Sequence, residues 1–317
     1  AMHRRHAARQ ERRRKQLEEA VGDLHAVQSL LDLQNEDGAS CWPTSDASWV
    51  PDWESLPSNL DPACAELSED EKPGRAQRKR KQLEAMAASI MPFVDRLIEE
   101  RQQQRVRIVE FGSGTGHLGI LIAYLRREST HVTLVERKDY TCRIAQDRIS
   151  SLKLDNVQVF CGDIEDYASS RQVFDLGTSL HSCGVLTDLI LDLCCSVHAS
   201  YVLCPCCYGQ CSRSENLSRF QRPRSKQFAE VMNEERFSSI LSGADYAIGQ
   251  GDWNFDDCPN FAKAKFCMRI VDADRNLSSE RMSCYRTCLR SLNPLNCSPK
   301  NNVVVGLHSA SCMVLNR

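Results

Sequence analysis

The sequence predicts an α/β fold in which a doubly wound, mainly parallel seven-stranded sheet carries helices on both faces. The apolar run at 106–111 leads directly into Gly112, Gly114 and Gly116, three glycines at alternate positions. A second apolar run ends on Glu136, about twenty residues after the last of these glycines. A glycine loop after one strand and an acidic residue at the end of the next strand are typical of such sheets. Further strands and helices alternate downstream, as β-α-β units require.

The domain is expected to begin with a helix at Arg75, where a charged segment is followed by apolar residues at helical spacing from Leu83 to Ile98. Seven strands should follow, the last pair forming a return, and a basic, polar stretch at 209–226 interrupts the alternation. The expected strands are 106–111, 131–136, 156–160, 174–181, 199–204, 263–271 and 302–307. The expected helices are 116–127, 138–152, 185–195, 225–240 and 277–291.

The chain is expected to divide into two regions. Residues 1–74 form an N-terminal helix and a linker, and residues 75–317 form the α/β domain. The first contains an arginine-rich start, apolar residues at helical spacing, and a linker at 35–74 that is rich in Asp, Glu, Pro and Ser. The linker carries three tryptophans, Trp42, Trp49 and Trp53. We expect these to pack across the surface of the domain rather than to stack on bases.

Composition excludes several classes of function. The formal net charge of -2 does not fit a protein that binds polyanions over its whole surface, although local basic stretches remain. No run of 18 apolar residues is present, so no membrane-spanning helix is expected. The 17 cysteines occur without a secretory signal, which favours free thiols in a reducing compartment. We therefore expect a cytoplasmic protein.

The spacing of the glycines indicates which adenosine cofactor is bound. Dinucleotide folds use G-x-G-x-x-G, with the pyrophosphate at a helix N-terminus. Here Glu110-x-Gly112-x-Gly114-x-Gly116 resembles motif I of class I S-adenosylmethionine (SAM) methyltransferases. This resemblance implies SAM as the cofactor and a Rossmann-like class I fold with an N-terminal helical extension. NAD binding and a degenerate fold are the alternatives.

The resemblance also implies roles for two acidic residues. Glu136 would accept hydrogen bonds from the ribose hydroxyls, and Asp163, at the end of the third strand, would accept one from the adenine amino group. Asp163 alternatively fits a helix N-cap, because Ile164 begins the next segment. The expected cofactor-binding residues are Glu110, Gly112, Ser113, Gly114, Gly116, Glu136, Arg137, Gly162, Asp163, Ile164 and Leu180.

His181 is the candidate general base. The fourth strand ends in Ser179-Leu-His-Ser-Cys183-Gly184 and lacks the (D/N)PP(Y/F) motif that many methyltransferases of amino and amide nitrogens carry there. This argues against a standard N6-adenine or glutamine methylase. Histidine titrates near neutrality and, at the carboxyl edge of the sheet, could take a proton from a hydroxyl or a ring nitrogen. A purely structural histidine is the alternative.

The fifth strand ends in a cysteine-rich segment, Leu203-Cys204-Pro205-Cys206-Cys207-Tyr208-Gly209, with Cys211 close behind. Only Cys204 and Cys207 have the two-residue gap of paired zinc ligands, so we expect no bound metal. A structural zinc site, with Cys183, His181 and Cys211 as possible further donors, is the alternative. RNA C5-cytosine methylases place one cysteine after strand four and another after strand five, as Cys183 and Cys204 would lie here. Covalent catalysis by thiolate is therefore an alternative to direct transfer.

A more specific resemblance rests on several segments together. These are His181-Ser-Cys-Gly, Thr187-Asp188, Cys204-Pro-Cys-Cys-Tyr-Gly, 297–306 (Cys-Ser-Pro-Lys-Asn-Asn-Val-Val-Val-Gly) and the basic helix starting at Arg78. In combination they are similar to the methyltransferase domain of the glutathione S-transferase C-terminal domain-containing proteins, over about 45–310. That family carries a transferase-like helical domain upstream. Residues 1–74 are therefore expected to be cut from such a domain, and this segment is where a protein partner could dock.

A wider kinship joins this family to the acceptor-stem tRNA 2′-O-methyltransferases, which implies an RNA substrate and tRNA first. A protein methyltransferase and a catalytically silent SAM-binding scaffold are the alternatives. Basic residues on the leading helix and in the stretch after the fifth strand fit phosphate contacts. The expected catalytic residues are His181, Cys183, Cys204 and Tyr208, and the expected substrate contacts are Cys206, Cys207, Arg222, Arg224, Lys300 and Asn301.

Overall fold

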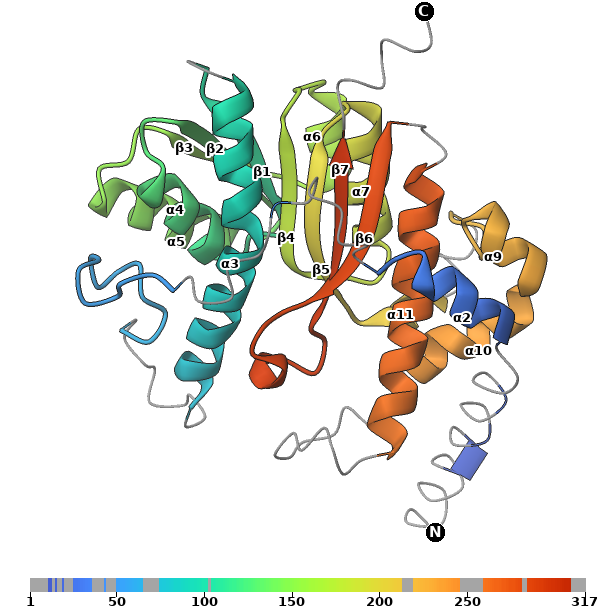
Figure 1. Cartoon of the computed structure of the whole chain (residues 1–317). Helices are drawn as coiled ribbons and strands as arrows, with labels where there is room; N and C mark the ends of the chain where they lie inside the picture. The colour runs from blue at the N-terminus through green and yellow to red at the C-terminus, as the bar shows by residue number, and fades with distance from the viewer. Residues whose placement is uncertain are drawn as a thin grey trace, which may run out of the picture.

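The computed structural model describes residues 11–12, 15, 19, 25–35, 43, 50–64, 74–101, 104–212, 219–245, 259–280 and 284–308. A single seven-stranded sheet lies at its centre, with the strand order β3-β2-β1-β4-β5-β7-β6 (Figure 1). β1 to β5 run parallel, and β7 is antiparallel to both β5 and β6. This is the strand order of class I methyltransferases, so the predicted fold class is confirmed.

The strands are β1 Val106–Phe111, β2 Thr130–Glu136, β3 Val157–Cys161, β4 Leu176–Cys183, β5 Ser200–Cys206, β6 Tyr285–Ser291 and β7 Asn302–His308. The α-helices are α2 His25–Asp32, α3 Arg75–Arg101, α4 His117–Leu125, α5 Asp139–Ser151, α6 Ile164–Ser169, α7 Leu186–Ser196, α9 Lys226–Val231, α10 Glu234–Ala244 and α11 Pro259–Glu280. Two short 3-10 turns, η1 Tyr208–Ser212 and η2 Leu295–Cys297, follow β5 and β6.

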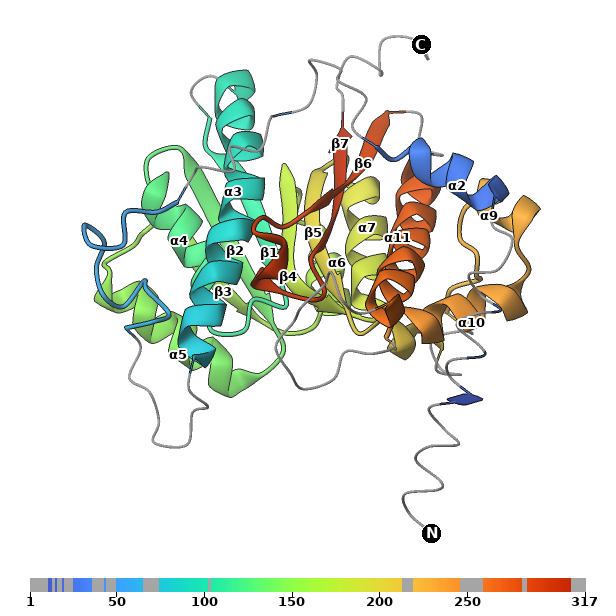
Figure 2. The same cartoon turned by 60° about the horizontal axis from the view of Figure 1, so that its bottom comes forward.

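Helices cover both faces of the sheet because its strands are apolar on both sides, as parallel strands usually are. In β1, Ile108 belongs to the core beneath α3, α4 and α5, whereas Val109 and Phe111 belong to the core beneath α6 and α7. The side chains of neighbouring residues thus enter opposite layers. α3 lies across the first face, and α7 and α11 lie on the second (Figures 1 and 2).

A third apolar cluster extends the second layer outward. α11 packs against α2, α9 and α10, which gather around it at one side of the molecule (Figure 2). Tyr208 and Cys211 of η1 belong to the same cluster. The cysteine-rich segment after β5 is therefore anchored in a core rather than displayed on a surface.

Two predictions for the C-terminal part are wrong. The expected strand at 263–271 lies inside α11, and the expected helix at 277–291 contains β6 from Tyr285 onward. The apolar run in this segment is buried on nearly every side, between the sheet and the third cluster, so it has no helical stripe. Periodicity alone cannot distinguish such a buried helix from a buried strand.

Trp53 confirms the packing interpretation of the linker. Its side chain is buried, its indole nitrogen donates to Glu84 Oε1 at 2.7 Å, and the Arg80 guanidinium lies 5.1 Å from the ring centre. Trp42 and Trp49 lie outside the described residues. Within the described part of the chain, no helix is long and apolar enough to cross a membrane.

Candidate active site

The glycine loop after β1 is held by backbone conformations that favour glycine. Gly112, Gly114 and Gly116 have φ values of 64°, 57° and 75°, in the left-handed region. A Cβ on Gly116 would also lie 2.7 Å from Leu134 Cδ1 and 3.0 Å from Ile120 Cδ1, so a side chain there would force these buried side chains to move. The loop turns into α4 and leaves the end of β1 accessible.

Glu136, the last residue of β2, faces this loop. Its carboxylate accepts hydrogen bonds from the backbone N–H of Gly114 at 3.0 Å and of Lys138 at 2.9 Å. A carboxylate has about four lone-pair directions, so two remain for a ligand. The geometry is compatible with the predicted binding of two ribose hydroxyls.

Glu110 stabilises the loop from below. The carboxyl group is buried, and its Oε2 accepts a hydrogen bond from Gly119 N–H at 2.8 Å. Burial raises the pKa of Glu110 to about 8; the Gly119 hydrogen bond opposes this rise, and the nearby charge of Glu136 adds to it. Glu110 is therefore mostly protonated at neutral pH and adds little charge beneath the loop.

A cavity of about 530 Å³ opens at the carboxyl ends of β1, β2 and β4, where ligands bind in doubly wound sheets. Six of the predicted cofactor residues line it: Gly112, Glu136, Arg137, Gly162, Asp163 and Ile164. Five predicted cofactor residues are not among its lining: Glu110, Ser113, Gly114, Gly116 and Leu180. The first group surrounds the cavity, and the glycines of the second shape the loop that borders it.

Asp163 forms the helix N-cap that the sequence offered as an alternative, and its contact with adenine stays a prediction. Its Oδ1 accepts a hydrogen bond from Asp166 N–H at 2.9 Å, and the Asp166 carboxylate accepts one from Asp163 N–H, which forms a capping box at the start of α6. Asp163 also lines the cavity. Because capping involves Oδ1, the Oδ2 atom can still accept a hydrogen bond from a ligand.

His181 and Cys183 line the same cavity from β4. The pairing of β4 with β5 shifts between Leu180 and Ser182, and His181 has a φ of 73°. This irregularity turns the imidazole out of the sheet, where its Nε2 lies 3.1 Å from Gln82 Oε1 of α3. The imidazole is exposed to the cavity, but the protein atoms gathered around it partly desolvate it; this desolvation, followed by the charge of Lys79, lowers the pKa of His181 below its ordinary value.

The other two predicted catalytic residues are corrected by the structure. Cys204 is fully buried, burial raises the pKa of its thiol to about 12, and its Sγ donates to Lys300 O at 3.4 Å. Tyr208 is also fully buried, and its hydroxyl donates to Asp272 Oδ2 at 2.7 Å. Neither side chain reaches the cavity, so Cys204 is not placed as a nucleophile and Tyr208 is not placed to stack on a base.

Cys183 differs from Cys204 in its surroundings. Its Sγ lies 3.0 Å from Cys206 Sγ on the adjacent strand. The hydrogen bond from the Cys206 thiol lowers the pKa of Cys183 to about 6, although burial opposes this shift. Of the two cysteines considered for covalent chemistry, only Cys183 is accessible and acidic.

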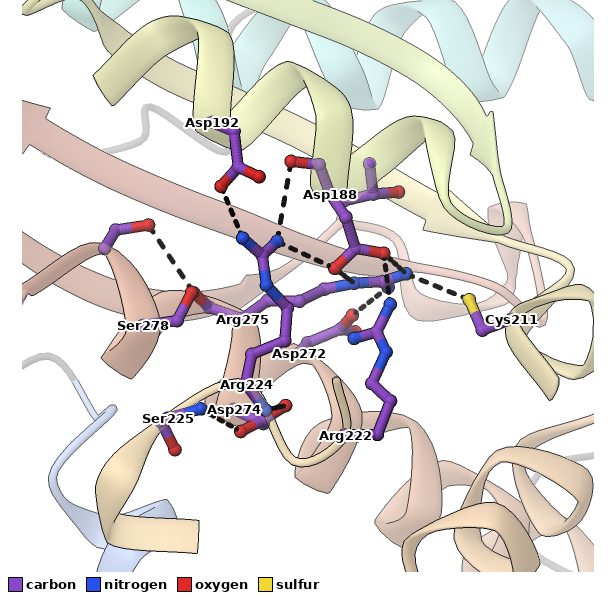
Figure 3. A network of polar contacts seen from close by, with 12 residues as sticks. Asp188, Asp192, Cys211, Arg222, Arg224, Ser225, Asp272, Asp274, Arg275 and Ser278 are labelled. Carbon is purple, nitrogen blue, oxygen red and sulfur yellow. Dashed lines mark hydrogen bonds and ion pairs between the residues drawn. The ribbon is translucent and has the colours of Figure 1, made fainter. Parts of the chain in front are cut away.

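Arg222 and Arg224 belong to a buried ion-pair network, which corrects their prediction as phosphate contacts. Asp188 of α7 lies 2.5 Å from Arg222 and 3.0 Å from Arg224, and Arg275 of α11 lies 3.1 Å from the same carboxylate. All three guanidinium groups converge on it in Figure 3. The side chains of Arg222 and Arg224 are only 1% and 7% exposed, so an RNA backbone cannot reach them.

The remaining predicted substrate residues are also involved in internal contacts. Lys300 pairs with Asp245, donates to Ala244 O at 3.2 Å and lies 4.8 Å from the ring centre of Tyr208. Asn301 is buried and donates to Leu295 O at 2.7 Å. Cys206 is buried and Cys207 half-buried, beside Cys183. The structure assigns Lys300 and Asn301 to packing beneath the site.

Several residues that line the cavity were not among the predicted site residues. Lys138 follows the acidic end of β2, Leu186 begins α7, and Gln210 lies in η1. Each follows the carboxyl end of a predicted strand, and that position was an available signal for all three. None belongs to a recognisable motif.

The methyltransferase relationship is supported by sequence comparison. Residues 78–214 match a family model described as a methyltransferase domain. The chain is 33% identical over 262 residues to the human glutathione S-transferase C-terminal domain-containing protein, covering 82% of this chain and 37% of that protein. A homologue from Drosophila pseudoobscura pseudoobscura is 38% identical over 232 residues, covering 73% and 37% respectively. The chain thus spans a little over a third of the length of these relatives.

Solved structures give a weaker similarity. A SAM-dependent methyltransferase from Agrobacterium tumefaciens is 13% identical, covers 38% of this chain and 44% of its own, and superposes with a TM-score of 0.31. The fold assignment rests on the strand order and on the family model.

Proposed function

We propose that this chain transfers a methyl group from SAM to RNA, with tRNA as the first candidate. It carries a methyltransferase domain, belongs to the family of the glutathione S-transferase C-terminal domain-containing proteins, and matches a little over a third of the length of the human member. The single observation that supports this most is that the predicted cofactor residues and the candidate catalytic residues line the same cavity. Gly112, Glu136 and Asp163 line it at the ends of β1 to β3, and His181 and Cys183 line it from β4. Cofactor and acceptor would therefore meet in one space.

The chemistry of transfer requires little from the protein beyond placement. A SAM sulfonium is already reactive, so holding its methyl group in line with the acceptor supplies most of the rate. The acceptor must lose a proton, and His181 is the basic group at that wall. Its lowered pKa keeps the imidazole neutral at physiological pH, and the contact with Gln82 fixes the ring.

The surroundings of His181 support a polyanionic acceptor. The N-terminal part of α3 carries Arg78, Lys79 and Lys81, all exposed, and Gln82 of the same helix reaches the His181 ring. A row of cations thus begins beside the acceptor wall. RNA phosphates would be attracted to it, and their contacts would orient the substrate without reading its sequence. Preference for tRNA rests on the resemblance to acceptor-stem methyltransferases.

Incubation of the purified chain with SAM labelled in its methyl group tests this proposal. Label should appear in total RNA, and digestion to nucleosides should then identify the acceptor atom. Label in total protein instead would favour a protein methyltransferase. Binding of SAM without label in either fraction would favour the silent scaffold.

Replacing Glu136 with alanine should weaken SAM binding tenfold to a hundredfold, about 1–3 kcal/mol, because the carboxylate both aligns the loop and accepts from the ribose. Calorimetric titration measures this directly. Asp147→Ala is the matched control, since it removes an exposed carboxylate from α5 outside the cavity. Equal affinities in both variants would remove Glu136 from the cofactor site.

Reversing the charge of Arg78 and Lys81 should weaken RNA binding across sequences and flatten its dependence on salt. Each lost phosphate contact reduces the slope of log affinity against log salt by about 0.7–0.9. The matched control is Arg143→Glu together with Arg127→Glu, which reverses two exposed charges elsewhere. A slope that is unchanged in the α3 variant would argue against an RNA path along this helix.

A further inference from the structure

Three thiols converge at the acceptor wall of the cavity. Cys183 ends β4, Cys206 ends β5 directly opposite it in the strand register, and Cys207 follows. Their three sulfur atoms all lie within 4.8 Å of one another, and the Cys183–Cys206 sulfurs are 3.0 Å apart. Thiolates bound at 2.3 Å to a tetrahedral zinc ion are separated by about 3.8 Å. Shifts of up to about 1 Å would therefore bring all three sulfurs to ligand positions.

The backbone holds this convergence in place. Cys207 has a φ of 53°, a left-handed conformation that a residue other than glycine adopts only where its surroundings enforce it. Gly184 N–H donates to Cys206 O at 3.0 Å, and Gln210 N–H donates to Cys207 O at 3.0 Å. The first hydrogen bond joins the ends of β4 and β5, and the second closes the turn that follows β5, both immediately beside the thiols.

The buried network fixes the same segment from the other side. Arg275 donates to Gly184 O at 2.9 Å, next to Cys183. Arg275 also donates to Cys211 Sγ at 3.4 Å (Figure 3). Tyr208, next to Cys207, is bound through its hydroxyl to Asp272 of the same network. The thiols therefore sit between rigid anchors, the arrangement that a preformed ligand set needs.

The composition of the cluster determines which ion it would accept. It contains sulfur alone, which selects soft and borderline cations and disfavours magnesium and calcium. Cys206 is buried, Cys207 half-buried and Cys183 exposed. An ion bound to them would be shielded from solvent on the Cys206 side and accessible on the Cys183 side. Cys183 also lines the cavity, which places the accessible side toward the acceptor.

Although the spacing of the cysteines along the chain predicts no bound metal, we propose that Cys183, Cys206 and Cys207 form a three-thiolate zinc site in the wall of the cavity, with the fourth coordination position filled by water or by a group of the acceptor. Zn²⁺ binds the thiolate form of each cysteine, so three Zn–S bonds form and every S–H proton still present on the three thiols is released to solvent. Sites with three protein ligands and one exchangeable position are the form that zinc takes where it meets substrate. The site does not depend on which substrate is methylated, and metal binding is measured without turnover.

Titration of the full, reduced chain with Zn²⁺ alone tests the site. One equivalent should bind, and Co²⁺ in its place should give the thiolate-to-cobalt absorption and the visible bands of tetrahedral coordination. Cys183→Ser and Cys207→Ser should each weaken zinc binding by at least about 100-fold, since even residues behind the ligands are worth 10–100-fold. Cys161→Ser, which removes an exposed thiol outside the cluster, should bind zinc as the unchanged protein does.

Thermal unfolding separates loss of the site from loss of the fold. Without metal, Cys183→Ser and the Cys161→Ser control should unfold near the same temperature; with Zn²⁺, only the control and the unchanged protein should gain stability. Failure to bind zinc in the reduced chain, or zinc affinity that survives both cluster substitutions, would overturn the proposal. So would a Cys183–Cys206 disulfide that persists in the reduced preparation, since it would remove two of the three ligands.

Discussion

Replacing Asp188 with asparagine should lower the free energy of unfolding by about 3–5 kcal/mol. The carboxylate is fully buried and lies within 3.1 Å of Arg222, Arg224 and Arg275. Burial by itself would raise the pKa of Asp188, but the three guanidinium charges hold it well below its ordinary range. Asparagine keeps the shape and removes the charge, so three buried cations lose their shared partner.

Urea or guanidinium denaturation, followed by circular dichroism, measures this loss. Asp192→Asn is the matched control: Asp192 contacts Arg224 from the same helix, but its side chain is 52% exposed. A surface pair of this kind contributes less than about 1 kcal/mol. If Asp188→Asn cost no more than the control, the network would not be what anchors the segment after β5.

Arg222 and Arg224 show why the sequence misplaces this network. A cluster of arginines in a polar stretch after a strand has the pattern of a phosphate-binding loop, and nothing local distinguishes it from a buried one. Their shared acidic partner, Asp188, lies 34 positions before Arg222, and Arg275 of α11 binds the same carboxylate, so these pairs form only when α7 and α11 pack together. Ion pairing over such separations is a tertiary property.

The cofactor half of the site was far more predictable than the acceptor half. Gly112 and Glu136 lie at the ends of adjacent parallel strands, so strand register alone brings them together. The cysteines were harder to place, because spacing along the chain suggested Cys204 and Cys207 as partners. The register of β4 against β5 instead pairs Cys183 with Cys206 at the strand ends, whereas Cys204 pairs with Leu180 further inside the sheet and is buried in the core.

Replacing His181 with alanine should lower the rate of methyl transfer by about 10²–10⁴-fold while leaving SAM affinity within about threefold, as expected for a general base. The imidazole lies at the acceptor wall and contacts Gln82, and His181 belongs to β4 rather than to the glycine loop expected to hold the cofactor. Single-turnover rates with labelled SAM and calorimetric SAM affinities separate the two effects. His131→Ala, at the opposite end of β2 from Glu136, is the matched control.

The dependence of activity on pH is a second, independent test of whether His181 acts as the general base. Partial desolvation of the ring lowers the pKa of His181 below its ordinary value of 6.5, and a base acts only when it is unprotonated. Activity should therefore be constant around neutrality and fall at a pH below 6.5, with the fall missing from the residual activity of His181→Ala. Lys79→Gln should shift this limb to higher pH, because removing the nearby positive charge makes protonation of the ring easier. A profile that neither substitution alters would show that His181 is not the base. Another group would then take the proton, or the acceptor would lose it without a base.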